Sequence, residues 1–397
     1  MESSLTYLSK LLLGSGAVYL LVKSLQLRNN YKDIHQPHHI TPYHCKRLKK
    51  SNHVIIDRKS STDMERKKVV VRVPATSANM GPGFDSVGMA IDMWTEITVE
   101  RSDTFGIVCE GEGADDIPTD ETNLVCLGMS AAFTAAGKTL PVLKYHLNNR
   151  IPYARGLGSS SAAIVGGLVA GLVLAGHTLE TWGSEALFNL AAEIEGHPDN
   201  VAPAIYGGVQ IGIHTGDKWI SDRVHLPPGM QCVFFIPNST GKTSIARGLL
   251  SDTVTRADAV FNIGRVAWLI NALATSNIEK MQYGVQDRLH QPQRAENMYP
   301  HLNPLIDAAV TAGASAVFLS GAGPTVMAIS SGLSGDLFTQ LEHERVDKKV
   351  AQAMLEAAEK CNIQGGVFIS KPTVHGAYVA SADPAFSAGL VRYAGDV

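Results

Sequence analysis

Small and hydroxyl-bearing residues cluster near the middle of the chain, in the stretch Arg155-Gly156-Leu157-Gly158-Ser159-Ser160-Ser161. Glycine adopts backbone dihedral angles that other residues avoid, so backbone N–H groups can converge on one point in such a loop. The apolar run that follows predicts a helix over Ser160–Ala175 that is buried on most sides. The free N–H groups and positive dipole end of that helix suit an anion, most simply phosphate. An ordinary glycine-rich turn before a core helix has the same composition.

Two better-known phosphate loops do not fit this stretch. A P-loop requires Gly-x-x-x-x-Gly-Lys-Ser/Thr, and Ile236 stands where the first glycine before Gly241-Lys242-Thr243 belongs. A dinucleotide-binding loop requires Gly-x-Gly-x-x-Gly, and Ser161 stands in place of its third glycine.

Two glutamates stand at the end of the predicted helix 181–195, directly before His197-Pro198-Asp199-Asn200. Carboxylates beside a phosphate loop suit Mg²⁺, which prefers oxygen ligands and often takes only one or two from the protein. Glu193 and Glu195 are therefore both candidate metal ligands, and a solvated helix end is the alternative interpretation.

Two further loops of small residues follow predicted strands. The first holds Asn79 and Asp85 in a glycine- and proline-rich bend, where an amide and a carboxylate suit an amine or a hydroxyl group. A tight turn with Asx hydrogen bonds would use the same residue types. The second, Ser320–Thr325, predicts by itself only a turn.

Charge and cysteine content exclude several classes of protein. Residues 1–60 carry ten Lys/Arg against three Asp/Glu, and the remainder carries 24 against 34. An acidic body makes a nucleic-acid-binding surface improbable. The five cysteines are scattered without a Cys-x-x-Cys pair, which argues against a disulfide framework and a zinc site.

Residues 1–63 differ in composition from the rest and are expected to be a basic, disordered or targeting extension. The apolar run Leu11–Val22 is shorter than the ~20 residues that a membrane-spanning helix needs, so no stable membrane span is expected. We expect a cytoplasmic protein, or an organelle-targeted one if residues 1–63 act as a targeting segment.

Hydrophobic patterning predicts mixed strands and helices without a regular β-α-β alternation, which indicates an α+β fold. The predicted strands are 69–73, 94–100, 105–110, 144–150, 208–214, 231–237, 316–320, 325–330 and 367–379. The predicted helices are 121–136, 160–175, 181–195, 257–283 with a break near Ser276, 303–312 and 337–361.

Four stretches, in their order along the chain, resemble the signatures of the GHMP kinases (galacto-, homoserine, mevalonate and phosphomevalonate kinases), and most closely the homoserine kinase branch. They are Pro74–Gly88 (PATSANMGPGFDSVG), Gly156–Ala163 (GLGSSSAA), His197–Ala204 (HPDNVAPA) and Ser320–Thr325 (SGAGPT). The resemblance spans roughly residues 67–380. Sister kinases differ in the first and third stretches, whereas the second marks the whole superfamily.

The resemblance implies a fold, a reaction and a domain division. The fold would be a ribosomal protein S5 domain 2-like N-terminal domain over residues 64–216, followed by a ferredoxin-like C-terminal domain over residues 217–397. The reaction would be phosphorylation of L-homoserine by ATP with Mg²⁺, a step of threonine biosynthesis. Assembly as a homodimer is a further expectation.

For the nucleotide and the metal, the resemblance implies that the loop from Arg155 to Ser161 surrounds the ATP phosphates and that Asn123 lies near the adenine. Ser160 and one of the two glutamates would hold Mg²⁺, with Glu195 preferred over Glu193. In many homoserine kinases the metal-binding glutamate stands further from the His-x-Asp-Asn stretch than either candidate does here.

For the substrate, the resemblance implies that Asn79, Asp85 and Asn200 hold the amine and hydroxyl end of homoserine. Arg247 and Arg294 would hold its carboxylate, which a guanidinium group binds in a bidentate manner. Thr243 would lie near the reacting hydroxyl, and Asp199 stands where superfamily relatives use an aspartate as base. Many homoserine kinases are thought to need no base, so the role of Asp199 stays open.

Two alternatives stay open. One is another GHMP kinase that acts on mevalonate or a sugar, although Asn79, Asp85, Arg247 and Arg294 favour an amino acid. The other is a non-catalytic ligand sensor with the GHMP fold, which loss of the metal carboxylate or a bulky residue in the phosphate loop would indicate; the sequence shows neither.

Overall fold

The structure is a computed structural model that describes residues 66–177, 184–330 and 345–385. All of these residues belong to a compact unit formed by residues 52–397. The predicted extension 1–63 and parts of the predicted helices 181–195 and 337–361 lie outside the described residues. Among the described residues, no helix is both long and apolar enough to cross a membrane.

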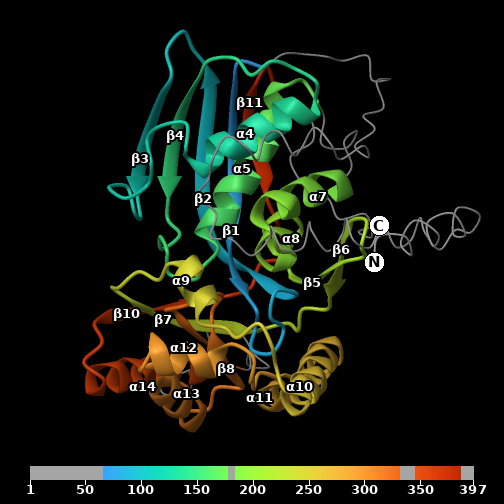
Figure 1. Cartoon of the computed structure of the whole chain (residues 1–397). Coiled ribbons are helices and arrows are strands. Elements are labelled where there is room, and N and C mark those ends of the chain that lie inside the picture. The colour runs from blue at the N-terminus through green and yellow to red at the C-terminus, as the bar shows by residue number, and fades with distance from the viewer. Residues whose placement is uncertain (1–65, 178–183, 331–344, 386–397) are drawn as a thin grey trace, which may run out of the picture. The chain divides into compact units, whose positions relative to one another are not determined.

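A large mixed sheet forms the first half of the described fold (Figure 1). The strand order is β11-β1-β2-β4-β3, and β5 pairs with β2 and with β6. The long strand β2 pairs with β5 through its first residues and with β4 through its last. The strands are β1 (Lys68–Ala78), β2 (Val87–Arg101), β3 (Gly106–Gly111), β4 (Leu143–Asn149), β5 (Val209–His214), β6 (Trp219–Val224) and β11 (Tyr378–Asp383).

Strand β1 confirms the β-branched strand predicted over 69–73. Val69, Val71 and Val73 are fully buried, whereas Lys68 and Arg72 are exposed and Val70 is half-buried. Since successive side chains point to opposite faces of a sheet, β1 presents one face to the core and the face of Lys68, Val70 and Arg72 outwards. Its last residues, from Thr76 to Ala78, are buried and lead directly into the first small-residue loop.

Four helices pack with this sheet, and the central one is α5. Helix α5 is buried on nearly every side, as predicted, and its glycines bring it into close contact with its neighbour α4. A Cβ on Gly167 would lie 2.2 Å from the carbonyl oxygen of Val125. The small residues of α5 are therefore required for helix packing as well as for the loop before it. The helices are α4 (Leu124–Ala135), α5 (Ser159–Leu174), α7 (Ser184–Glu195) and α8 (Pro198–Tyr206).

An antiparallel four-stranded sheet forms the second half, with the order β10-β7-β9-β8. With helices before β8 and between β9 and β10, this is the βαββαβ arrangement of ferredoxin-like folds, as predicted. Helices α13 (Leu302–Thr311) and α14 (Val346–Lys360) bury their apolar residues against the sheet. The strands are β7 (Gln231–Pro237), β8 (Ala316–Leu319), β9 (Val326–Ser330) and β10 (Gly365–Ser370).

A series of helices connects β7 to α13, and it carries the predicted site residues Thr243, Arg247 and Arg294. The predicted break near Ser276 is confirmed, because α10 ends at Ala274 and Ser276 has a positive φ of 54°. The connecting helices are α9 (Thr243–Gly248), α10 (Arg256–Ala274), the 3₁₀ helix η3 (Ile278–Lys280), α11 (Met281–Gly284) and α12 (Gln291–Asn297).

The sheets do not divide at residue 216. Strand β6 lies beyond this position but pairs with β5, and β11 returns from the end of the chain to pair with β1. The strands predicted within 367–379 are confirmed as β10 and β11, which lie in different sheets. Helix α8 and strand β6 were not predicted, because Pro198 and Pro203 and the polar residues of 219–224 obscure their periodicity.

The contact between α4 and α5 gives a direct test of the packing. Gly167→Val is expected to lower the free energy of unfolding by about 1–3 kcal/mol or more, because the added atoms meet the backbone of α4. Gly264→Ala in the exposed interior of α10 is the control, since a Cβ there has open space around it. Gly264→Ala is expected to raise the free energy of unfolding by about 0.5–1 kcal/mol. Urea unfolding of both variants checks this, and equal stabilities would contradict the packing.

Candidate active site

The phosphate loop is clamped between the end of β1 and the loop Ser320–Thr325. Gly156 and Gly158 have φ angles of 77° and 71°, a region that favours glycine. A Cβ on Gly158 would lie 1.9 Å from Thr76 Oγ1, and one on Gly156 would lie 2.3 Å from the carbonyl oxygen of Ser320. Side chains larger than hydrogen are therefore excluded at both positions.

Hydrogen bonds fix the same loop from both sides. The backbone N–H of Thr76 donates to the carbonyl of Leu157 at 3.1 Å, and Ser320 Oγ donates to the carbonyl of Gly156 at 2.7 Å. Leu157 itself is buried. The loop is thus held rigidly before any ligand binds.

Helix α5 starts one residue earlier than predicted, at Ser159, directly after the loop. Its N-cap residue, Gly158, has no side chain to accept a hydrogen bond, and its first turn contains no acidic residue. The N–H groups of the first turn therefore keep their capacity to bind an anion, as the dipole of a 16-residue helix favours.

Glu195 is the glutamate that reaches this helix start. Its Oε1 accepts hydrogen bonds from Ser161 Oγ at 2.7 Å and from Ser160 Oγ at 3.2 Å. Glu193 is exposed on α7, and no hydrogen bond joins it to the loop among the described residues. The structure therefore brings Glu195, but not Glu193, together with the serines.

Two residues assigned to the nucleotide already have structural partners. Asn123 is buried at the N-cap of α4, where its side chain accepts from the N–H of Val125 and donates to the carbonyl of Pro118. Arg155 lies 3.3 Å from Glu112 Oε2 and donates to the carbonyl of Asn238 at 3.0 Å. Both side chains therefore help to fix the loops in which they lie.

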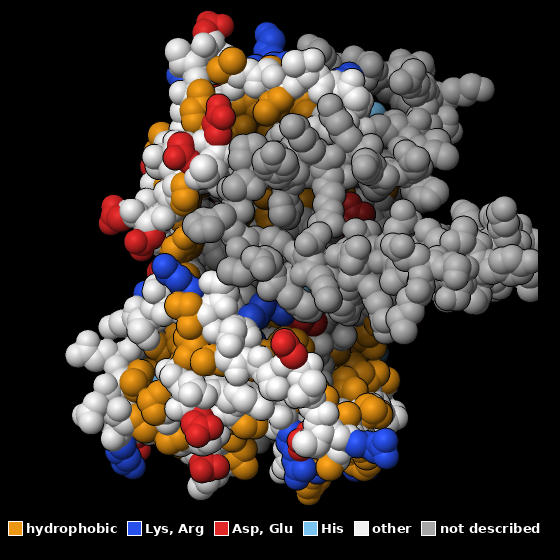
Figure 2. All heavy atoms as spheres, in the orientation of Figure 1, with side chains coloured by type: hydrophobic (Ala, Val, Ile, Leu, Met, Phe, Trp, Pro, Cys, Tyr) orange, Lys and Arg blue, Asp and Glu red, His pale blue; other side chains and the backbone are white. Residues whose placement is uncertain are grey.

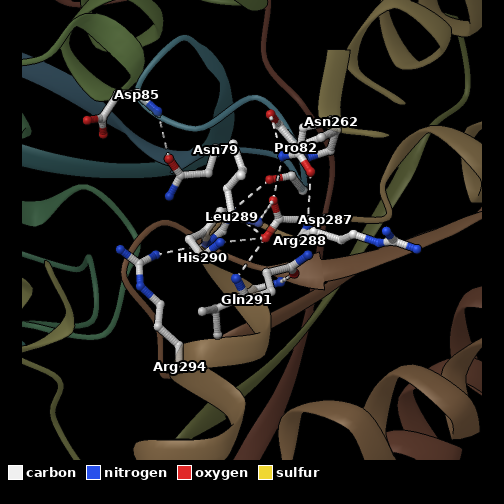
Figure 3. Close-up of polar contacts among 12 residues, drawn as sticks. Asn79, Pro82, Asp85, Asn262, Asp287, Arg288, Leu289, His290, Gln291 and Arg294 are labelled. Atoms are coloured by element: carbon white, nitrogen blue, oxygen red, sulfur yellow. Dashed lines mark hydrogen bonds and ion pairs between the residues drawn. The ribbon is translucent and has the colours of Figure 1, made fainter. Parts of the chain in front are cut away.

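The first small-residue loop has an unusual backbone. Asn79, Met80 and Asp85 all have positive φ angles, between 45° and 67°. The Asn79 side chain supports this bend, since its Oδ1 accepts from the N–H of Asp85 (Figure 3). Its Nδ2 donates to the carbonyl of Gly321. Backbone strain of this kind is concentrated at functional sites and persists where surrounding contacts hold it.

Asp85 and Arg247 were assigned to opposite ends of the substrate, but in the structure they bind each other. The pair is bidentate, with N–O distances of 2.6 and 2.9 Å, and about a third of each side chain is exposed. Burial would raise the pKa of Asp85, but the hydrogen bonds and charge of Arg247 outweigh it and keep this pKa below its usual value. The two side chains thus neutralise each other's charge.

Arg294 has a different environment, because it is 1% exposed and no carboxylate of the described residues lies within ion-pair distance. Its NH1 donates to the carbonyl of Gly321 and contacts His290 Nδ1, both at 3.0 Å. Burial lowers the pKa of Arg294 to about 10, and the charge of Arg247 acts in the same direction. The side chain is therefore a cation at neutral pH whose charge is not fully compensated.

Phe84 connects the two arginines. The guanidinium carbons of Arg247 and Arg294 lie 5.4 and 5.6 Å from the centre of its ring. An aromatic face attracts cations at such distances, so Phe84 helps to keep two like charges in one place. An anion bound by both arginines would relieve their repulsion.

The stretch His197–Asn200 begins α8 and faces the phosphate loop and Asp85. Asn200 Oδ1 accepts from Thr76 Oγ1 at 2.7 Å, and Asp199 Oδ1 lies 2.7 Å from His197 Nδ1. One carboxylate oxygen each from Asp85 and Asp199 and one ring nitrogen of His197 lie within 4.8 Å of one another. One oxygen of Asp199 is thus already engaged by His197, and Asn200 is fixed beside the loop.

Thr243 is the first residue of α9 and is exposed, one helical turn before Arg247. No hydrogen bond joins it to another predicted site residue among the described part of the chain. The predicted residues therefore form three groups. The first is the phosphate loop with Glu195, the second is Asn200 held by Thr76, which was not predicted, and the third is the charged group of Asp85, Arg247 and Arg294. Asn79 joins the third group through Gly321.

Sequence reasoning missed Thr76, Phe84, His197, His290 and Ser320 as site-forming residues. Thr76, Phe84, His197 and Ser320 lie within the four stretches that resemble the family signatures. Their position in these stretches, and not their residue type, could have indicated that they form the site. His290 lies outside every such stretch, four residues before Arg294. A spacing of four residues places His290, the N-cap of α12, on the same side as Arg294. This spacing was the only indication in the sequence that the two side chains meet.

The His197–Asp199 pair makes a prediction about pH. Burial would lower the pKa of His197, but the charge and hydrogen bond of Asp199 outweigh it and raise this pKa to about 9. Since the unfolded value is ~6.5, the stabilisation is complete below pH ~6.5 and is lost as the pH rises through about 9. Asp199→Asn is expected to abolish this pH dependence and to lower the pKa of His197 by two or more units, as NMR titration of the ring would measure. A wild-type midpoint near 6.5 would contradict the ion pair.

Family comparisons agree with this geometry. A model of the GHMP kinases N terminal domain matches residues 123–208, and a model of the GHMP kinases C terminal domain matches residues 269–360. The homoserine kinase of Moorella thermoacetica is 42% identical over 310 residues, which cover 78% of this chain and 99% of that protein. The homoserine kinase of Caldanaerobacter subterraneus is 44% identical over 271 residues, covering 68% and 86%.

Solved structures give the same result at the level of the fold. The homoserine kinase of Cytophaga hutchinsonii superposes with a TM-score of 0.67 at 26% identity, covering 81% of this chain and 98% of that one. The phosphomevalonate kinase of Streptococcus pneumoniae has a TM-score of 0.55 at 14% identity, covering 77% and 99%, and shares the fold. The chain therefore belongs to the homoserine kinase family of the GHMP kinases.

Proposed function

We propose that this chain transfers the γ-phosphoryl group of ATP to the hydroxyl group of L-homoserine. Relatives named homoserine kinase, at about 40% identity over most of the chain, support the reaction. The observation that carries the substrate assignment is the charged group of Asp85, Arg247 and Arg294, because it offers one carboxylate and two guanidinium groups to a zwitterion. Mevalonate and sugars have no ammonium group to match Asp85.

Substrate binding is proposed to exchange one ion pair for others. The homoserine ammonium replaces Arg247 on Asp85, and the homoserine carboxylate binds Arg247 and Arg294. Three cations (the ammonium group, Arg247 and Arg294) then face two anions (Asp85 and the homoserine carboxylate). The net charge of the site is unchanged, but Arg294 gains a carboxylate partner. Desolvating a charge is costly unless it is paired, which favours a ligand that carries both charges over one that carries neither.

ATP is proposed to place its phosphates at the start of α5. The glycine loop and the N–H groups of the first turn of α5 support this assignment, together with Arg155 and the serines 159–161. Asn123, at the start of α4, is assigned to the adenine side of the ATP site. Because its amide already caps α4, it would shape this side of the site and would not hydrogen-bond the base.

The residues around Glu195 fit Mg²⁺. One carboxylate and two serine hydroxyls converge at the helix start, and all of these donors are oxygen atoms. Glu195 and Ser160 would hold the ion. Bound there, Mg²⁺ would neutralise negative charge on the ATP phosphates.

For the transfer step, Asn200 and Thr243 are assigned to orient the homoserine hydroxyl. In a loose transition state the nucleophile loses its proton late, so positioning suffices and the proton passes to a phosphate oxygen. Asp199 is assigned an electrostatic role, because His197 engages one of its oxygens and its side chain is buried.

Release of ADP tests the proposed reaction. With ATP and Mg²⁺, L-homoserine is expected to give turnover, whereas mevalonate, galactose and shikimate give no more ADP than the reaction without acceptor. Faster turnover of mevalonate or galactose would show that the charged group has another purpose. Homoserine binding without ADP release would indicate a ligand sensor.

Glu195 and Glu193 form a matched pair for testing the metal site. Glu195→Gln is expected to raise the Mg²⁺ concentration needed for half-maximal activity by about 10- to 100-fold, because an amide binds the ion less well than a carboxylate. Glu193→Gln, two residues away on the exposed face of α7, is expected to leave this concentration unchanged. Equal effects of the two variants would contradict the assignment of Glu195.

A further inference from the structure

We infer that His290 is a positioning residue, which aims the Arg294 guanidinium at the substrate and couples it to the loop of Asn79 and Asp85. The identity of the anion that Arg294 receives rests on the proposed function. The role of His290 itself rests on its contacts with Gly81 and Arg294, and His290 lies outside every stretch that resembles the family signatures.

Each ring nitrogen of His290 has complementary partners. Nε2 lies 2.7 Å from the carbonyl oxygen of Gly81 and 3.5 Å from Asp287 Oδ2, and both of these oxygens can only accept. Nδ1 lies 3.0 Å from Arg294 NH1 (Figure 3). A carbonyl oxygen only accepts and a guanidinium group only donates. The ring is therefore neutral, with its proton on Nε2 and the lone pair of Nδ1 facing Arg294. Its complete burial, which lowers its pKa, agrees with this state.

The ring is fixed by the start of α12. The carboxylate of Asp287 accepts from the backbone N–H groups of Leu289, His290 and Gln291, at 2.7 to 2.9 Å. Asn262 of α10 donates to the same carboxylate at 2.7 Å. Figure 3 shows these contacts converging on Asp287. Helix α12 therefore starts at a fixed point, and the imidazole has little freedom to turn away.

Arg294 depends on this fixed ring for its direction. Its Nε donates to the carbonyl of Ala246 at 3.4 Å, and its NH1 bonds to His290 and Gly321. Its NH2 makes no hydrogen bond to another described residue, so the two hydrogens of NH2 remain for a carboxylate. The carbonyl of Gly321 also accepts from Asn79, which places the guanidinium group next to the Asn79–Asp85 loop.

The charges around His290 make its neutral form essential to this role. Asp287, Asp85 and Arg294 are the charged groups that act on it. A protonated ring would place a second cation against Arg294 and remove the only acceptor that Nδ1 provides. His290 thus acts by accepting from Arg294, and not by exchanging protons with the substrate.

Two variants separate the contacts of the two ring nitrogens. His290→Asn keeps an acceptor near the Nδ1 position and loses the donor to Gly81. His290→Gln can reach Gly81 but has no acceptor facing Arg294. We expect His290→Gln to raise the homoserine KM by about 10- to 100-fold, as for the loss of one hydrogen bond to a charged group, with the ATP KM and kcat little changed. His290→Asn is expected to change the homoserine KM by less than about threefold.

Leu305→Ala is the control for lost stability, since Leu305 is a buried member of the apolar cluster of the second sheet. It is expected to lower the melting temperature and to leave both KM values unchanged. Equal effects of the Asn and Gln variants on the homoserine KM, or a parallel rise in the ATP KM, would overturn the inference. A wild-type protein that does not phosphorylate homoserine would instead overturn the proposed function.

A measurement on the unmodified protein does not depend on how the variants fold. In ¹⁵N NMR of the histidine-labelled wild type at neutral pH, His290 is expected to show a protonated Nε2 and an unprotonated Nδ1. A proton on Nδ1, or a doubly protonated ring, would be incompatible with acceptance from Arg294 and would overturn the inference.

Discussion

The buried guanidinium of Arg294 is the constraint on which the site depends. A cation that is 1% exposed must be compensated, and no carboxylate of the described residues does so. Instead, acceptors come from α9, from the loop after β8 and from His290 directly before α12, and the ring of Phe84 lies beside them. The three acceptors follow β7 in the chain, whereas Phe84 lies in the loop after β1, so the ring and the acceptors surround Arg294 only when the two halves of the fold pack together.

The glycine loops follow from the same constraint. Gly321 accepts from Arg294, and the adjoining Ser320 holds Gly156 of the phosphate loop. The loop that supports the cation therefore also supports the proposed nucleotide site. Gly158 in turn lies against Thr76, which binds Asn200. The phosphate donor and the amino-acid acceptor are thus linked by backbone contacts that only small residues permit.

Much of the fold could be predicted from the sequence, because its signals are local. The β-branched residues Val69–Val73 predict a strand, and the small and apolar residues of α5 predict a buried helix. Strand β11 could not be placed, because its pairing with β1 joins residues about 300 positions apart. Nothing in the local pattern of residues 378–383 selects that partner over a neighbour of β10.

The candidate site was predictable in its residue types and less so in its contacts. Arg247 and Arg294 were assigned alike, yet one is paired with Asp85 and the other has no carboxylate partner among the described residues. Glu193 and Glu195 stand two residues apart, and only the direction of each side chain decides which meets the serines. His290 carried no signal beyond its spacing from Arg294. Such differences arise from tertiary packing, which spacing in the sequence does not specify.

A binding cycle tests most directly whether Arg294 receives the substrate carboxylate. Calorimetry would compare L-homoserine with 3-aminopropan-1-ol, which lacks only the carboxylate, in the wild type and in Arg294→Met, an apolar replacement that leaves no buried charge. The account predicts that losing the carboxylate weakens binding to the wild type by about 1.5–3 kcal/mol more than to the variant. The same loss in both proteins would contradict it, and would mean that the buried cation of Arg294 serves the fold and not the substrate.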